Sequence, residues 1–334
     1  MREDGEPTDT SRAGQDESGP SAELRSGGRG RGPRGGGGAG MAMQAGGSNS
    51  LALARLLPGP VRRIDREIAD RLSKAPLQLN QFGYDPYGFH PVAARQLLLP
   101  AALLYRYYFR VDTFDIERVP EGRVLLIANH SGQFAYDGSM LSMAMLLHAR
   151  TPRLCRGMGE YFLWRVPWMG ISASRIGTMV GTPENCVAML RDGECVMVFP
   201  EGAEGANKPF RKRYQLQRFG LGFMRLALET RTPIVPVGIV GAEEQQPGFA
   251  NLADFGRRVN LPSFPITITQ PWFGPLGSVA ALPVKYRIYF GEPLSFEGDA
   301  HDEDSIVEGQ VGIVKGAIGD LLERGLRERT GIFR

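Results

Sequence analysis

The chain has 334 residues, of which 42% are hydrophobic, and a formal net charge of +3. That length allows one large or two smaller domains with a real core, and so slight a charge favours no class of partner by itself. Its three cysteines show no CxxC spacing and have no histidine at ligand distance, which argues against a disulfide framework or a zinc site and is typical of a reducing compartment.

Residues 1–48 form a low-complexity segment dominated by Gly, Ser, Arg, Asp and Glu. Such a composition cannot bury enough apolar surface to order itself, so we expect a solvated tail. The RGG-like run 29–35 leaves RNA or anionic-surface binding as a second interpretation, although no nucleic-acid partner is expected for the protein. Met41 and Met43 leave open a later start of translation, and the polar, Gly-rich beginning shows no secretory signal pattern.

Residues 49–92 are expected to hold one helix followed by a loop. Ile64, Ile68 and Leu72 recur at helical spacing, with arginines at the positions between them. An Arg-rich amphipathic helix either lies on a membrane surface or packs on the domain that follows it. The sequence favours neither alternative.

The remaining residues, 93–334, are predicted to form one α/β domain. Short apolar runs alternate with helical patterns, which is typical of a mostly parallel sheet flanked by helices. Helices are expected at 93–108, 137–149, 182–191, 216–230 and 303–328, strands at 123–128, 175–180, 194–199, 233–240 and 284–289, a helix or loop at 159–170 and a loop at 201–214. In such sheets, ligands bind beyond the carboxyl ends of the strands.

A histidine and an aspartate follow the apolar run 124–128. His130 lies in a Gly-containing turn, and Asp137 comes seven positions later. A carboxylate can hold an imidazole and fix its tautomer, and the imidazole can then take a proton from a hydroxyl. A histidine at the end of a strand is also a common surface or capping residue, so the pair alone does not decide between the two roles.

Two further blocks add to this pattern. The apolar run 196–199 ends in a proline, with Glu201 and Gly202 in the turn, and 232–241 is an apolar strand carrying prolines. Because parallel strands end at one edge, His130 and Glu201 are expected on the same edge of the sheet. In this order and spacing the chain resembles the glycerolipid acyltransferases of the bacterial lysophosphatidate (1-acylglycerol-3-phosphate) acyltransferase type. The matching residues, within a resemblance over about 95–295, are Asn129, His130, Asp137, Gly177 to Gly181, Phe199 to Gly202, and Ile234 to Val237.

The resemblance implies an O-acyltransferase of phospholipid or glycerolipid synthesis with a glycerol-3-phosphate acyltransferase-like fold. It implies that His130 is the general base on a lipid hydroxyl and that Asp137 orients it. The hydroxyl would attack acyl-CoA or acyl-ACP directly, with no metal and no cofactor besides that acyl donor. The residues expected to shape the substrate site are Asn129, Gly132, Glu201 and Gly202.

Two departures from the family pattern matter. Six residues separate His130 from Asp137, where the family has four. A continuous helix would place them about 10 Å apart along its axis, so the segment must loop, which Gly132 permits. The Thr-Arg pair that follows the family's FPEG block is Ala203-Glu204 here, and a glutamate would repel the phosphate of an acceptor.

Two acceptors remain open. The acceptor is either a neutral glycerolipid, such as a mono- or diacylglycerol, or a lysophospholipid whose phosphate meets a nearby basic run. The departures also leave open a non-catalytic lipid-binding protein of the same fold. The basic run consists of Lys208, Arg211, Lys212 and Arg213.

Three segments suit contact with a membrane. Aromatic and basic residues interleave at 104–110 and 161–169, and 271–277 is an apolar loop rich in Pro and Gly. Trp, Tyr and Arg favour the headgroup interface, although core packing also explains such residues. No stretch reaches the roughly 18–20 apolar residues of a spanning helix, and the nearest, 97–105, contains a proline. We therefore expect peripheral association with the cytoplasmic face of a membrane.

Overall fold

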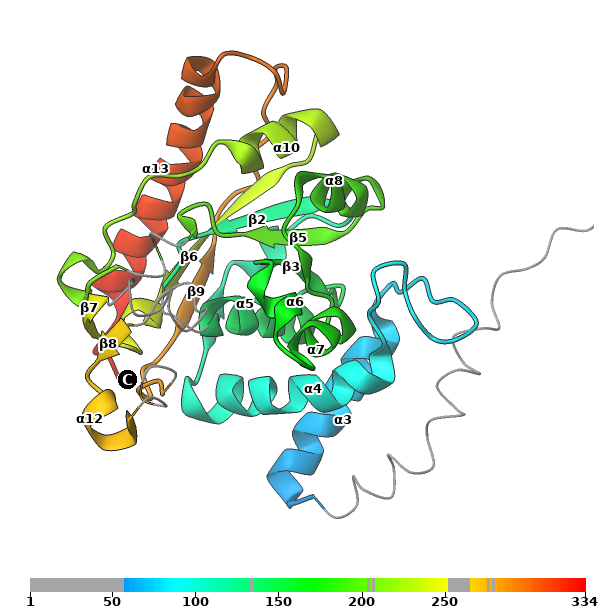
Figure 1. The fold of residues 1–334 in the computed structure, drawn as a ribbon, viewed down its shortest axis with the longest axis vertical. Helices are drawn as coiled ribbons and strands as arrows, with labels where there is room; N and C mark the ends of the chain where they lie inside the picture. The colour runs from blue at the N-terminus through cyan, green and yellow to red at the C-terminus, as the bar shows by residue number, and fades with distance from the viewer. Residues whose placement is uncertain are drawn as a thin grey trace, which may run out of the picture. The chain divides into compact units, whose positions relative to one another are not determined.

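A seven-stranded sheet forms the centre of the protein (Figure 1). The computed structural model describes residues 57–131, 135–202, 205, 208–251, 265–274, 277 and 280–334. The predicted tail 1–48 and Gly132 lie outside the described residues. The strands follow the order β1-β9-β6-β2-β5-β3-β4. Their bounds are β1 Asp112–Phe114, β2 Val124–Ala128, β3 Cys155–Gly159, β4 Met179–Val180, β5 Cys195–Val198, β6 Ile234–Val240 and β9 Arg287–Phe290.

The strand directions confirm the predicted α/β class with a mostly parallel sheet. Strands β6, β2, β5, β3 and β4 run parallel to one another. Strand β9 is antiparallel to β6, and β1 is parallel to β9. Strands β7 (Gly248–Asn251) and β8 (Pro265–Thr267) form a separate antiparallel pair.

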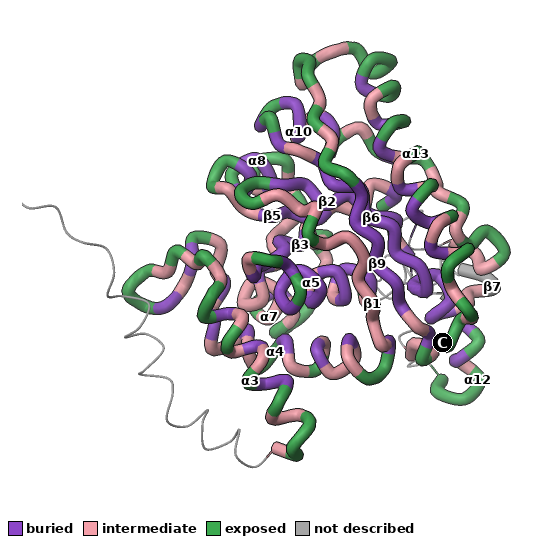
Figure 2. Tube along the Cα trace, turned by 180° about the vertical axis from the view of Figure 1, so that it is seen from behind, coloured by how far each residue is buried: buried purple, intermediate pink, exposed green. Residues whose placement is uncertain are grey.

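Helices cover both faces of the sheet, as the continuous apolar strands require. The residues of β2 and β6 are all buried, which is typical of strands packed on two sides. Figure 2 shows this buried centre in purple. The helices are α3 Gly59–Lys74, α4 Pro91–Leu103, α5 Tyr136–His148, α6 Phe162–Arg165, α7 Met169–Arg175, α8 Pro183–Arg191, α10 Gly222–Thr230, α12 Gln270–Phe273 and α13 Asp304–Glu328, with single helical turns η1 Leu104–Tyr108, η2 Ile116–Arg118, η3 Phe210–Lys212 and η4 Ala242–Glu244.

The alternation of side chains along β2 divides the core into two layers. Leu126 and its neighbours at even positions pack with α3, α4 and α5. Leu125 and Ile127 pack with α8, α10 and α13 on the opposite face. Period-two alternation therefore places the carboxyl end of β2 between two helical layers.

Helix α3 packs on the domain, one of the two alternatives left open for it. Its stripe of Ile64, Ile68 and Leu72 is buried and belongs to the same cluster as the sheet. Arg71 donates hydrogen bonds to carbonyls at the end of α5, Leu146 and Ala149. No helix among the described residues combines the length and apolar content needed to cross a bilayer.

Several element boundaries differ from the predicted ones. The expected strand 175–180 shrinks to β4, because α7 continues to Arg175 and Gly177, at φ +94°, turns the chain. The helix expected at 216–230 begins only at Gly222. The residues before Gly222 are not helical, because the N–H groups of Gln217 and Gly220 donate hydrogen bonds to Glu201 and Pro200 in the turn that follows β5.

Candidate active site

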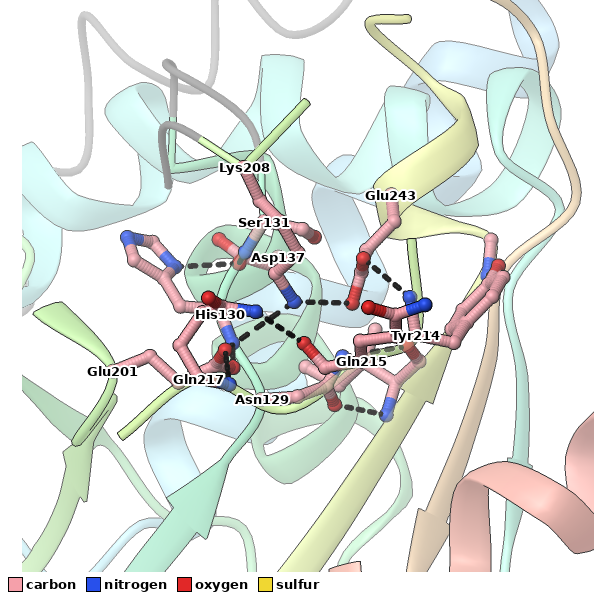
Figure 3. A network of polar contacts seen from close by, with 12 residues as sticks. Asn129, His130, Ser131, Asp137, Glu201, Lys208, Tyr214, Gln215, Gln217 and Glu243 are labelled. Atoms are coloured by element: carbon pink, nitrogen blue, oxygen red, sulfur yellow. Dashed lines mark hydrogen bonds and ion pairs between the residues drawn. The ribbon is translucent and has the colours of Figure 1, made fainter. Parts of the chain in front are cut away.

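His130 and Asp137 meet at the carboxyl end of β2. The two side chains are joined by a contact of 2.7 Å between His130 Nδ1 and Asp137 Oδ2 (Figure 3). Asp137 lies in the first turn of α5, which begins only at Tyr136, so the segment between the two residues is not one continuous helix. The unusual spacing is therefore compatible with a dyad. Asp137 is fully buried, whereas the imidazole remains 17% exposed.

Further contacts fix the orientation of the Asp137 carboxylate. Oδ2 also accepts from the Ser131 N–H at 2.9 Å, and Oδ1 accepts from the Gly138 N–H at 2.8 Å. A carboxylate that accepts in this way selects the tautomer with the proton on Nδ1 of His130. Nε2 is then the ring nitrogen that can accept a proton.

The surroundings of His130 are acidic. Burial lowers the pKa of His130, but the charge and hydrogen bond of Asp137 and the charges of Glu201 and Glu160 together raise it above its ordinary value. The ring of Phe199 lies 4.6 Å from the imidazole, centroid to centroid. This environment increases the basicity of the imidazole.

Glu201 lies at the same edge of the sheet, as its position after β5 predicted. It is 3% exposed, and Oε1 accepts from the His130 N–H at 3.0 Å. Oε2 accepts from the Gln217 N–H at 2.8 Å. Glu201 therefore ties the backbone of the turn after β2 to the loop before α10. Gly202 follows at φ +53°, and its N–H donates to the Phe199 carbonyl.

Asn129, the residue after β2, hydrogen-bonds to the neighbouring strand β6. Its Nδ2 donates to the Ile239 carbonyl at 3.1 Å, and its Oδ1 accepts from the Ile239 N–H at 2.8 Å. The side chain is fully buried. Asn129 thus continues the pairing of β2 with β6 and holds the residue before His130 in place.

The predicted basic run divides into two parts. The Nζ of Lys208 lies 3.2 Å from both Glu201 and Glu243, and its side chain is 4% exposed. Its charge is met by these two carboxylates. The other three members are exposed, and Arg213 lies 3.9 Å from Glu244. Arg211 and Lys212 make no ion pair with any other described residue.

Three residues of the site were not predicted from the sequence. Glu243 and Tyr214 join Lys208 in a buried polar network (Figure 3). Gly205 packs so closely that a Cβ there would lie 2.5 Å from the Cβ of Glu201 and 3.3 Å from that of His130. The sequence feature that could have identified Gly205 is its position four residues after Glu201. The expected contribution of Ala203 and Glu204 lies outside the described residues.

Comparison with known proteins finds a family profile and several similar proteins. Residues 110–240 match the family profile described as Acyltransferase, and this range holds both members of the dyad. "Uncharacterized protein Rv0502" of Mycobacterium tuberculosis is 36% identical over 260 residues, covering 76% of this chain and 71% of that protein. The human "DGAT1/2-independent enzyme synthesizing storage lipids" is 24% identical over 56% of this chain and 54% of its own length.

A solved structure is also similar. The "1-acyl-sn-glycerophosphate (LPA) acyltransferase, PlsC, from Thermotoga maritima" aligns with a TM-score of 0.48 and 14% identity, over 86% of this chain and 90% of that one. The mycobacterial relative and the family profile decide the assignment. The chain belongs to the Acyltransferase family, and it is an acyltransferase.

Proposed function

We propose that the chain transfers a fatty acyl group from acyl-CoA or acyl-ACP to a hydroxyl of a glycerolipid. Nε2 of His130 takes the hydroxyl proton while the oxygen attacks the thioester carbonyl. The C–O bond forms, the C–S bond of the donor breaks, and the departing thiolate takes the proton from the imidazolium to leave as the thiol. Asp137 holds the imidazole and stabilises its protonated form. The observation that supports this most directly is the 2.7 Å contact in a site where the imidazole remains accessible. A positioned base of this kind contributes on the order of 10²–10⁴ in rate.

The charges around His130 favour a neutral acceptor. Asp137, Glu201 and Glu160 all act on the imidazole as negative charges. The one cation in contact with Glu201, among the described residues, is Lys208, which is buried and paired. An anionic phosphate held close to His130 would be repelled there. The name of the human relative, an enzyme "synthesizing storage lipids", also supports a mono- or diacylglycerol acceptor.

Arg211 and Lys212 support a second acceptor class. Both are exposed on η3, three and four residues after the buried Lys208 in its loop, and neither is paired with a described residue. Two such cations suit the phosphate of a lysophospholipid. Charge reversal at both positions would then abolish activity on a phosphorylated acceptor and spare a neutral one.

We further propose that the protein acts at the cytoplasmic face of a membrane. Aromatic side chains are exposed at two places that the sequence singled out. Tyr161 and Trp168, next to α6 and α7, are 67% and 81% exposed, and Trp272 and Phe273 on α12 are 74% and 60% exposed. Such residues partition favourably into the headgroup region. Co-sedimentation with liposomes tests this proposal, and a protein that stays in the supernatant with all compositions contradicts it.

A panel of acceptors tests the proposed reaction. The purified protein is given one radiolabelled acyl-CoA or acyl-ACP with monoacylglycerol, diacylglycerol, lysophosphatidate or lysophosphatidylcholine, and the lipid products are separated. We expect label in di- or triacylglycerol. Label confined to phosphatidate would instead assign the acceptor site to Arg211 and Lys212. Transfer to none of these lipids from either donor would refute the proposed function.

A further inference from the structure

A buried ammonium lies between two buried carboxylates beside the catalytic turn. The Nζ of Lys208 is 3.2 Å from Glu201 Oε2 and 3.2 Å from Glu243 Oε1 (Figure 3). The exposed fractions of the three side chains are 4%, 0% and 3%. Charges this deeply buried persist only when they are paired and hydrogen-bonded.

Each carboxylate of this network also holds a backbone segment. Glu201 accepts from the N–H groups of His130 and Gln217, at 3.0 and 2.8 Å. Glu243 accepts from the Tyr214 N–H at 2.7 Å, and the Tyr214 hydroxyl accepts from the Gly241 N–H at 2.9 Å. Lys208 therefore joins the turn after β2, the turn after β5 and the end of β6.

The charge of Lys208 is what allows two carboxylates to lie so close together. Burial raises the pKa of Glu243, and the charge and hydrogen bond of Lys208 hold that rise back. Without the ammonium, the buried Glu201 carboxylate would lose its ion-pair partner and lie beside a second buried carboxylate, Glu243. Glu201 would then no longer be held where it accepts from the His130 N–H.

We infer that Lys208 is a positioning residue for acyl transfer. It acts through Glu201, whose Oε1 fixes the peptide of His130 and so sets the imidazole against Asp137 and the substrate. This role rests on the proposed function of His130 as the general base. It also differs from binding of an acceptor phosphate, because the ammonium is buried and already paired.

A double-mutant cycle in the full-length protein tests the inference. Lys208→Met, Glu201→Gln and the double variant are compared in kcat and in KM for donor and acceptor, each after its fold and melting temperature have been checked. Misplacement of a catalytic group by about 1 Å costs on the order of 100-fold in rate. We expect a loss of kcat of about that size in Lys208→Met, unchanged KM values, recovery in Lys208→Arg, and equal kcat in Glu201→Gln and the double variant.

Other outcomes overturn the inference. A loss confined to KM would show that Lys208 contacts substrate, and fully additive losses would show that it does not act through Glu201. If Lys208→Met fails to fold, the comparison of the double variant with Glu201→Gln still decides, because the double variant keeps the net charge of the wild-type network. Lys74→Met is the matched control, because Lys74 is exposed on α3 and pairs with Asp70, and it should keep wild-type kcat. If the wild type transfers the acyl group and Lys208→Met has the same kcat, this inference alone is refuted. If the wild type transfers no acyl group, the proposed function is refuted.

Discussion

Replacement of Asp137 by asparagine should impair catalysis more than folding. The carboxylate accepts three hydrogen bonds, from His130 Nδ1, the Ser131 N–H and the Gly138 N–H. An amide has only one accepting oxygen. If that oxygen faces His130 and Ser131, the amide nitrogen opposes the Gly138 N–H. If it faces Gly138, the amide nitrogen opposes the Ser131 N–H and forces the His130 proton onto Nε2.

The magnitude follows from these two orientations. One buried N–H loses its acceptor in either case, which destabilises the fold by about 1–3 kcal/mol. When the amide oxygen faces the Gly138 N–H, His130 carries its proton on Nε2 and cannot act as a base through that nitrogen. This type of change lowers kcat by on the order of 10²–10⁴. Loss of the negative charge also removes the largest influence that raises the pKa of His130.

The assay is steady-state acyl transfer over a range of pH, with thermal melting measured in parallel. We expect a low kcat and an acidic limb of the kcat/KM profile that moves to lower pH. Asp70→Asn is the matched control, because Asp70 is exposed on α3 and pairs only with Lys74 among the described side chains. A folded Asp137→Asn protein with wild-type kcat and an unmoved acidic limb would refute the reasoning.

Three more outcomes are expected. In the wild type, kcat/KM should fall as the pH drops through an apparent pKa above 6.5, because nearby carboxylates raise the pKa of His130 and only the neutral base is active. An acidic limb of the kcat/KM profile with an apparent pKa below 6.5 would contradict this. Gly205→Ala should displace Glu201 and lower kcat, and urea titration should show a fold destabilised by about 1–3 kcal/mol. The control Gly309→Ala, in α13 with open space around it, should have a neutral or stabilising effect. Ile68→Ala should reduce the free energy of unfolding by about 2–5 kcal/mol, and an unchanged urea midpoint would show that α3 lies outside the core.

The long apolar strands were predictable because burial on both faces leaves a continuous apolar run. The predicted strands 123–128, 194–199 and 233–240 correspond to β2, β5 and β6 within a residue. Strand β3 lacks such a run, since it carries Arg156 among glycines. That guanidinium is buried through ion pairs with Asp85 and Glu194, which come from distant parts of the chain.

The same distinction applies to the site. The dyad was predictable because both members follow one strand within a short segment. The pairing of Lys208 was not, since its partner Glu243 lies 35 residues away and the sequence shows Lys208 only as one of several basic residues. Local pattern identifies groups that bear chemistry, whereas pairing between buried charges is decided by the packing of distant turns.

Transfer of a radiolabelled acyl group to a lipid alcohol by the wild type and by His130→Gln tests the proposed mechanism most directly. Both proteins are first shown to be folded by circular dichroism and melting. We predict that the wild type forms the acylated lipid and that His130→Gln is slower by on the order of 10²–10⁴. Equal rates for the two proteins would contradict the assignment of His130 as the general base.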